Sequence, residues 1–207
     1  MTVSNDELEG ARQRVAERFG TKEVPAVMYL VPAEAVRDTA LNLARGLDGD
    51  GTLLSRGDRL LVGLGVAVAK AGQGSRLGQW LAQAALVAGK SEADAEATRA
   101  VALTCATYNG YYKFKALAEG ALGTDFDNFQ PALRATPFVK SHLSKALVEL
   151  ICVAISVQNG CGHCVAGHVQ AARAAGASAA AVDEAVRAGA VIGALASWEA
   201  VSSTSVP

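Results

Sequence analysis

We expect this chain to fold as an all-α protein, because its apolar pattern favours helices and its composition suits their packing. Apolar residues recur at intervals of three and four, and turn signals lie far apart, so that no stretch resembles a β-strand. Hydrophobic residues make up 51% of the chain, but aromatic residues only 5%. Most apolar residues are Ala, Val and Leu, which favours closely packed helices over a core of large side chains.

Capping signals divide the first part of the chain into five predicted helices. Ser55 suits an N-cap, the segment SEAD at 91–94 resembles a capping box, and Pro32 suits the first turn of a helix. The Gly-rich segment GLDGDGT separates the second helix from the third. The predicted helices run from Asn5 to Gly20, Pro32 to Ala44, Arg56 to Lys70, Ser75 to Ala88, and Ser91 toward Gly120.

Three more helices are predicted after a turn-rich connector, GTDFDNFQPALRATP. The Asn-Gly pair at 159–160 is a helix-stop signal, so that Cys161 stands at or near the start of the next helix. The predicted helices run from Phe138 to Gln158, Cys161 to Ala175, and Ser178 to about Val201.

Length, charge and apolar runs exclude several classes of protein. A chain of 207 residues suits a single domain, 1–207. The chain has 19 Lys and Arg residues and 20 Asp and Glu residues, so that it lacks the excess of positive charge that favours binding to nucleic acid or anionic lipid. No apolar run reaches the roughly 18 residues of a membrane-spanning helix, and the acidic start MTVSNDELEG lacks the blocks of a signal peptide. We therefore expect a soluble, cytoplasmic protein that binds neither nucleic acid nor membranes.

A weak internal repeat appears when the chain is aligned with itself at an offset of 89 residues, as between Leu54 and Leu143. Both copies show a long apolar helix, a Gly break, a short helix, another Gly break and a long helix. The halves would be 1–124 and 125–207, although any two Ala-rich helical hairpins would match nearly as well. If the repeat is real, only the second half kept reactive side chains. The positions aligned with Glu149, Cys161, Cys164 and His168 are Leu60, Gly72, Ser75 and Gln79.

The segment from Glu149 to His168 holds the residues best suited to chemistry. A reducing cytosol does not favour a static disulfide framework, and two of the four cysteines, Cys161 and Cys164, have the Cys-x-x-Cys spacing of reactive pairs. At about 100° per residue, positions 161, 164 and 168 fall within an arc of about 60° on one helix face. Unpaired N–H groups and the helix dipole favour a thiolate at a helix start.

Glu149 lies about three turns before the helix break, beside apolar residues. A carboxylate in such a helix costs several kcal/mol unless it is paired or protonated. The antiparallel return of the next helix can bring it over the thiols and the imidazole. We expect burial to raise the pKa of Glu149, so that it shuttles protons to the thiols through His168 or a water.

Zinc binding is the main competing interpretation of this segment. Cys161, Cys164, His168 and Glu149 give a plausible ligand count, but structural zinc usually organises small folds, and these helices are expected to fold without it. We therefore expect neither a metal nor a tightly bound cofactor. His163, between the two thiols, points to another side of the helix and is expected to be accessory.

The remaining cysteines and histidine are expected to be ordinary structural residues. Cys105 and Cys152 occupy apolar helix positions, where a buried, inert thiol is the default. His142 opens a predicted helix as a polar residue.

The spacing Glu-x11-Cys-x2-Cys-x3-His, filled by Glu149, Cys161, Cys164 and His168, resembles the alkylhydroperoxidase D family of the carboxymuconolactone decarboxylase-like superfamily. The string AISVQNGCGHCVAGH is close to the signature of that family. The resemblance is good from about Asp125 to the C-terminus and only topological before it. It implies an all-helical bundle and a thiol-dependent peroxidase that reduces organic hydroperoxides, because simple decarboxylases of the superfamily lack the cysteine pair.

The resemblance also implies roles and partners. A helix-start argument favours Cys161 as the more acidic thiol, but His168 lies nearer Cys164, and the resemblance also assigns the peroxide attack to Cys164. Cys161 would resolve the sulfenic acid into a disulfide, with Glu149 and His168 as a proton relay. The reductant would be a dihydrolipoyl group on a partner protein, and the assembly a homo-oligomer, most simply a trimer.

Two rival functions use the same residues. One is a general thiol–disulfide oxidoreductase that acts on protein disulfides. The other is a zinc-binding or redox-sensing interaction protein.

Overall fold

The structure is a computed structural model that describes residues 3–48, 53–72, 74–126 and 129–203. Every regular element in these residues is a helix, which confirms the predicted all-α class. Residues 49–52, 73 and 127–128, which belong to predicted loops, lie outside the described residues. In chain order the elements are α1 (Asn5–Phe19), η1 (Ala26–Tyr29), α2 (Ala33–Leu43), η2 (Ala44–Asp48), α3 (Arg56–Ala71), α4 (Arg76–Val87), α5 (Glu92–Leu122), η3 (Gly123–Phe126), α6 (Thr136–Val139), α7 (Lys145–Asn159), α8 (Gly162–Ala174) and α9 (Ala179–Ser203).

Helices α1 and α2 begin and end within one residue of their predicted bounds. Ser4 caps α1 through a capping box, in which its hydroxyl accepts a hydrogen bond from the Glu7 amide at 3.3 Å and its own amide donates to the Glu7 carboxylate at 2.9 Å. Gly20 ends α1 in the left-handed conformation, with a φ of 63°. Pro32 precedes α2 as its N-cap, and the chain then continues through the π-helical turn η2 to Asp48.

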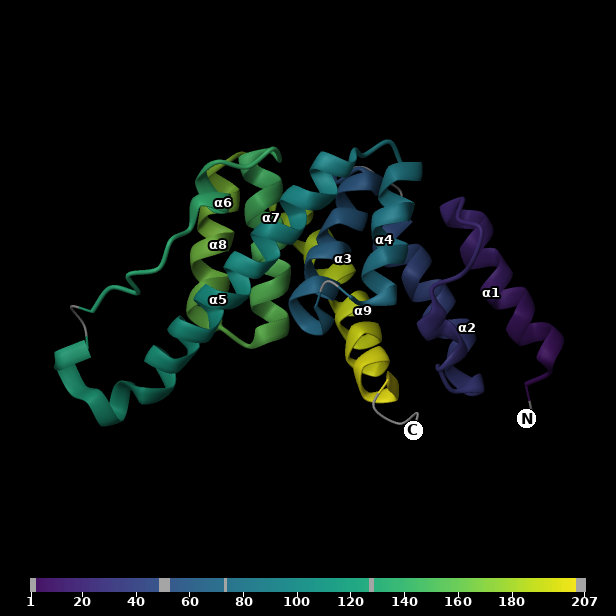
Figure 1. Cartoon of the computed structure of the whole chain (residues 1–207), viewed down its shortest axis with the longest axis horizontal. Coiled ribbons are helices and arrows are strands. Elements are labelled where there is room, and N and C mark those ends of the chain that lie inside the picture. Colours follow the sequence, from purple (N-terminus) through teal and green to yellow (C-terminus); the bar gives the residue numbers. More distant parts are fainter. Residues whose placement is uncertain (1–2, 49–52, 73, 127–128, 204–207) are drawn as a thin grey trace.

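The core of the molecule is built around α3, which packs against α4, α5, α7 and α9 (Figure 1). Glycines let these helices approach closely. A Cβ on Gly65 of α3 would come within 2.7 Å of the Ile151 side chain on α7, and one on Gly189 of α9 within 2.9 Å of Ala154 Cβ. This close approach explains how a chain with few aromatic residues fills its interior.

A buried ion pair ties α3 to α9. Arg59 is only 2% exposed, and its Nη2 lies 2.8 Å from Oε2 of Glu184. The same carboxylate oxygen accepts a hydrogen bond from the Leu54 amide at 3.0 Å. Because both charges are withdrawn from water, each depends on the other for compensation.

The order α3, α4, α5 is repeated as α7, α8, α9, and α3 and α7 start at residues 56 and 145, which are 89 residues apart. The division of the chain into two degenerate halves stays a prediction. Ser75, which the proposed repeat aligns with Cys164, is buried and has a structural function. Its hydroxyl donates to Glu199 Oε2 at 2.6 Å and accepts from the Gly78 amide at 3.0 Å, so that it caps α4.

One predicted helix is wrong at its start. The stretch predicted as a single helix from Phe138 to Gln158 is divided into the short α6 and the separate α7. The reason is Ser144, whose hydroxyl accepts a hydrogen bond from the Leu147 amide at 3.3 Å and thereby starts a new helix. His142 therefore lies between helices, exposed, with Nε2 3.6 Å from Asp94 Oδ1.

The C-terminal half of α5 extends away from the bundle (Figure 1). It carries exposed apolar side chains, among them Leu117, which is 79% exposed. None of the helices in the described part of the chain has the length and apolarity that a membrane-spanning segment requires.

Candidate active site

The candidate site begins where α7 turns into α8. Asn159 is the last residue of α7, and Gly160 follows in the left-handed conformation with a φ of 67°. Cys161 is the N-cap of α8, and its Sγ accepts a hydrogen bond from the Cys164 amide at 3.3 Å. The predicted stop signal therefore places Cys161 at the helix start, where the Cys164 amide and the helix dipole favour negative charge on a reduced sulfur.

Cys161 and Cys164 are joined in a disulfide, with an S–S distance of 2.10 Å and a Cα–Cα distance of 5.3 Å. Both residues are buried, Cys161 at 2% and Cys164 at 6% exposure. A helix turn brings two residues three apart close enough to bridge without distorting the chain. The pair therefore has the proximity that a dithiol–disulfide cycle requires.

Glu149 and His168 form a second pair beside the first. The carboxylate of Glu149, on α7, lies with Oε2 2.7 Å from Nδ1 of His168, on α8, and its other oxygen pairs with Lys145 one turn earlier. Glu149 is only 4% exposed, as expected for a residue in an apolar helix. Antiparallel packing of α7 and α8 thus brings together two residues that are 19 positions apart.

The predicted pKa of Glu149 is wrong in direction. Burial acts to raise its pKa, but the hydrogen bonds from His168 and Lys145 outweigh burial and hold the pKa below its ordinary value. Glu149 is therefore an ionised carboxylate that orients the imidazole. The sequence argument missed this because it counted the apolar neighbours and not the lysine one turn away.

His168 also contacts the free thiol of Cys105, on α5. Burial acts to lower the pKa of His168, but hydrogen bonds to Cys105 and Glu149 raise it to about 9. The side chain is 17% exposed and packs edge-on against the ring of Phe138, with centroids 5.7 Å apart. At neutral pH the ring is therefore protonated and lies between two acidic groups.

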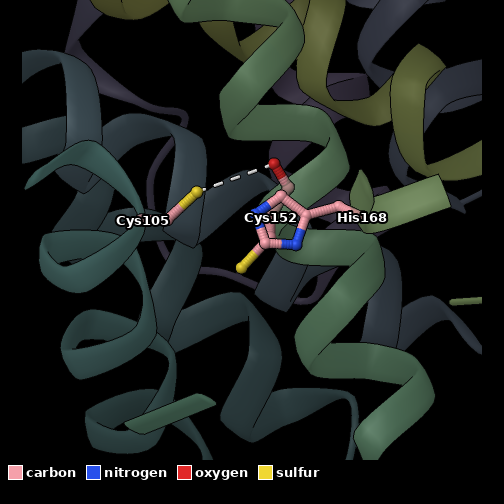
Figure 2. A group of neighbouring side chains, drawn as sticks. All are labelled: Cys105, Cys152 and His168. Carbon is pink, nitrogen blue, oxygen red and sulfur yellow. Dashed lines mark hydrogen bonds between the residues drawn. The ribbon is translucent and has the colours of Figure 1, made fainter. Parts of the chain in front are cut away.

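Cys105 lies inside the bundle near Cys152 and His168 (Figure 2), and it belongs to a small polar network with Ser156 and Asn109. Its Sγ donates to the backbone oxygen of Cys152 at 3.7 Å and lies 3.7 Å from Ser156 Oγ. Asn109 Nδ2 donates to that hydroxyl at 3.0 Å. Hydrogen bonding by the Cys152 thiol, followed by that of His168, lowers the pKa of Cys105 to about 6 in spite of burial.

His163 lies apart from these contacts. It is exposed on α8, and its ring stacks near Tyr112 of α5, with centroids 5.1 Å apart. The expectation that it points to another side of the helix from Cys164 agrees with its exposure. Its accessory function stays a prediction.

Comparison with known proteins identifies the family. The model of the carboxymuconolactone decarboxylase family matches residues 121–203, which include the disulfide and the Glu149–His168 pair. The chain is 32% identical to alkyl hydroperoxide reductase AhpD of Azorhizobium caulinodans over 169 residues, 82% of this chain and 88% of the relative. It is 37% identical to AhpD of Anaeromyxobacter dehalogenans over 179 residues, 84% of this chain and 90% of the relative. The chain belongs to the AhpD family.

As an AhpD-family protein, the chain has the expected motif in two contacting pairs, Cys161 with Cys164 and Glu149 with His168. The catalytic function of each residue stays a prediction. Cys105 and Cys152 are buried, as predicted, but their position beside His168 was not anticipated. No local spacing signals it, because Cys105 is 63 positions from His168 (168 − 105) and reaches it only through the packing of α5 against α7 and α8.

Proposed function

We propose that this AhpD-family protein is a thiol-dependent peroxidase that reduces organic hydroperoxides through Cys161 and Cys164. The observation that carries the proposal is the disulfide at the start of α8, in a chain related over most of its length to proteins named alkyl hydroperoxide reductase. A peroxidase of this type needs a dithiol that closes and reopens in each cycle, and two cysteines on one helix turn suit that need.

In the first step the Cys164 thiolate attacks one oxygen of the hydroperoxide. The O–O bond breaks, an alcohol leaves after it takes up a proton, and Cys164 becomes a sulfenic acid. Cys161 then attacks that sulfur, which forms the disulfide and releases water. The two electrons lost by the two sulfurs reduce the hydroperoxide to alcohol and water.

Glu149 and His168 would act as the proton relay of this cycle. The ionised carboxylate fixes the imidazole through Nδ1, and a protonated ring supplies positive charge and a transferable proton one helix turn after Cys164. His168 follows Cys164 by four residues on the same helix, so that the two lie on one face of α8. We therefore assign the attacking thiolate to Cys164 and the resolving thiol to Cys161.

A dithiol donor must reopen the disulfide. We propose a dihydrolipoyl group on a partner protein, which is oxidised to its cyclic disulfide as Cys161 and Cys164 are reduced. We also propose a homo-oligomer, most simply a trimer, because exposed apolar side chains such as Leu103 and Leu117 on α5 need cover. A sedimentation mass equal to one 21.2 kDa chain at micromolar concentration would contradict the oligomer.

Anaerobic stopped-flow mixing of the reduced protein with hydroperoxides of increasing size tests the proposal. We expect two thiols to be lost for each peroxide consumed, and turnover when a dihydrolipoyl compound is added. Absence of peroxide consumption, together with turnover on a protein disulfide, would overturn the peroxidase and favour a thiol–disulfide oxidoreductase.

Single substitutions assign the two sulfurs. Cys161→Ser should accumulate a sulfenic acid at Cys164, which a dimedone-type probe labels and mass spectrometry locates. Cys164→Ser should not react with peroxide. Labelling of Cys161 in the Cys164→Ser protein, with no label on Cys164 in the other variant, would reverse the assignment.

A further inference from the structure

We propose that Cys105, Cys152 and His168 form a binding site for a thiophilic divalent cation, Zn²⁺ in the first instance, and that its occupation inhibits the peroxidase. Figure 2 shows the two cysteines and the imidazole as neighbouring side chains, which come from helices α5, α7 and α8. Their ligand atoms all lie within 4.8 Å of one another. The site differs from the redox-active pair, because Cys161 and Cys164 are joined to each other and Cys105 and Cys152 are free.

The distances suit a tetrahedral ion. Zn–S bonds of about 2.3 Å and Zn–N bonds of about 2.0 Å place neighbouring ligand atoms roughly 3.5–3.8 Å apart. The three ligand atoms, within 4.8 Å of one another, therefore need to approach by at most about 1.3 Å at any pair. Rotation of two cysteine side chains supplies a movement of that size. Three protein ligands leave the fourth position for water or for Ser156 Oγ, which lies 3.7 Å from Cys105 Sγ.

Charge balance favours the ion in this interior. Cys105 and Cys152 are both fully buried, where an uncompensated charge is costly. Two thiolates neutralise the two positive charges of the cation, and a neutral imidazole adds none. The complex as a whole is therefore uncharged. The metal takes the place of the thiol protons and of the Nε2 proton of His168, all of which are released to solvent, so that binding does not require either thiol to be ionised beforehand.

The surroundings of the three ligands already have the arrangement that orients metal ligands. Glu149 engages Nδ1 of His168 at 2.7 Å, which leaves Nε2 as the ring nitrogen for the cation. A carboxylate that accepts from the far nitrogen of a metal-bound histidine is the usual outer contact of such ligands. Ser156 receives a hydrogen bond from Asn109, so that its own proton is available to the sulfur of Cys105.

Occupation of the site would remove His168 from the peroxidase. The ring that the proposed mechanism uses to carry a proton would hold the cation instead through the same nitrogen. Because His168 is partly exposed, the cation can reach the ligands from its side of the site. The expected effect is inhibition by zinc that a chelator reverses.

The test uses the full chain with the Cys161–Cys164 disulfide intact, so that only the buried thiols can bind. Denatured protein should first show two free thiols. Titration with Co²⁺ should give thiolate-to-cobalt charge-transfer bands and the visible bands of a tetrahedral site, saturating at one ion per chain, and Zn²⁺ should displace them. Cys105→Ser and Cys152→Ser should each abolish these bands, and Glu149→Gln should weaken binding about 10- to 100-fold.

The matched control is the double variant Cys161→Ser, Cys164→Ser, which should bind Co²⁺ as the wild type does. Circular dichroism shows whether each variant keeps its helices, and Cys152→Ala replaces Cys152→Ser if the latter unfolds. Lack of tetrahedral bands in the wild type overturns the proposal. The proposal is also overturned if Co²⁺ binding persists in Cys105→Ser and Cys152→Ser but is lost when Cys161 and Cys164 are both replaced by serine. These readouts do not depend on peroxidase activity, so that failure of either proposal is recognised separately.

Discussion

Replacement of Glu149 by glutamine removes the charge that holds His168 while it keeps the size of the side chain. Burial acts to lower the pKa of His168, and hydrogen bonds to Cys105 and Glu149 raise it from 6.5 to about 9. That difference corresponds to about 3 kcal/mol in favour of the protonated ring. Because Cys105 and Glu149 both contribute to this rise, Glu149→Gln should lower the pKa of His168 by about one pH unit or more. Peroxidase turnover should fall roughly tenfold to a thousandfold, which overlaps the contribution of about 10²–10⁴-fold that a positioned acid–base group makes.

The assay is an NMR titration of the imidazole signals in metal-free, oxidised protein, combined with the pH profile of turnover. The alkaline limb of the turnover profile should move to lower pH in Glu149→Gln. An unchanged His168 titration with an unchanged rate would refute the reasoning and reassign Glu149 to structure.

The contact between Glu149 and His168 should stabilise the fold only within a limited pH range. The pKa of His168 is raised in the fold, so that its contribution is complete below about pH 6.5 and is lost as the pH rises through about 9. The pKa of Glu149 is lowered, so that its contribution is complete above about pH 4.5 and is lost as the pH falls through the lowered value. Urea unfolding should therefore show the largest difference between wild type and Glu149→Gln between these limits.

Two further predictions concern the interior. Glu184→Ala should lower the free energy of unfolding by about 3–5 kcal/mol, because the buried Arg59 guanidinium, 2% exposed, would lose the carboxylate that compensates its charge. Urea denaturation measures this change. A loss below about 1 kcal/mol would contradict a buried pair. Cys105 should titrate with a pKa of about 6 in metal-free, oxidised protein, seen as ultraviolet thiolate absorbance that Cys105→Ser removes. Because this pKa is lowered in the fold, the contribution of Cys105 to stability should be lost as the pH falls through about 6. A midpoint near pH 9 in the ultraviolet titration would show that Cys105 is not a thiolate at neutral pH.

Local sequence determined the helices and the order of the motif. Caps act over three or four residues, so that the helix starts at Ser55 and Ser91 could be predicted from the residues next to them. The pairing of Cys161 with Cys164 is local in the same sense, because both lie on one turn of one helix. These features are readable from spacing alone.

The contact between Glu149 and His168 across the α7–α8 hairpin was predicted from the sequence, but only the tertiary structure revealed the second partner of His168. Cys105 reaches His168 through the packing of α5 beside α7 and α8. The ionised state of Glu149 followed from two partners, His168 and Lys145, that offset its burial. Helical periodicity says which face of a helix is apolar but not which face of a distant helix it meets. The environment that sets charge at this site is therefore a property of the packed bundle.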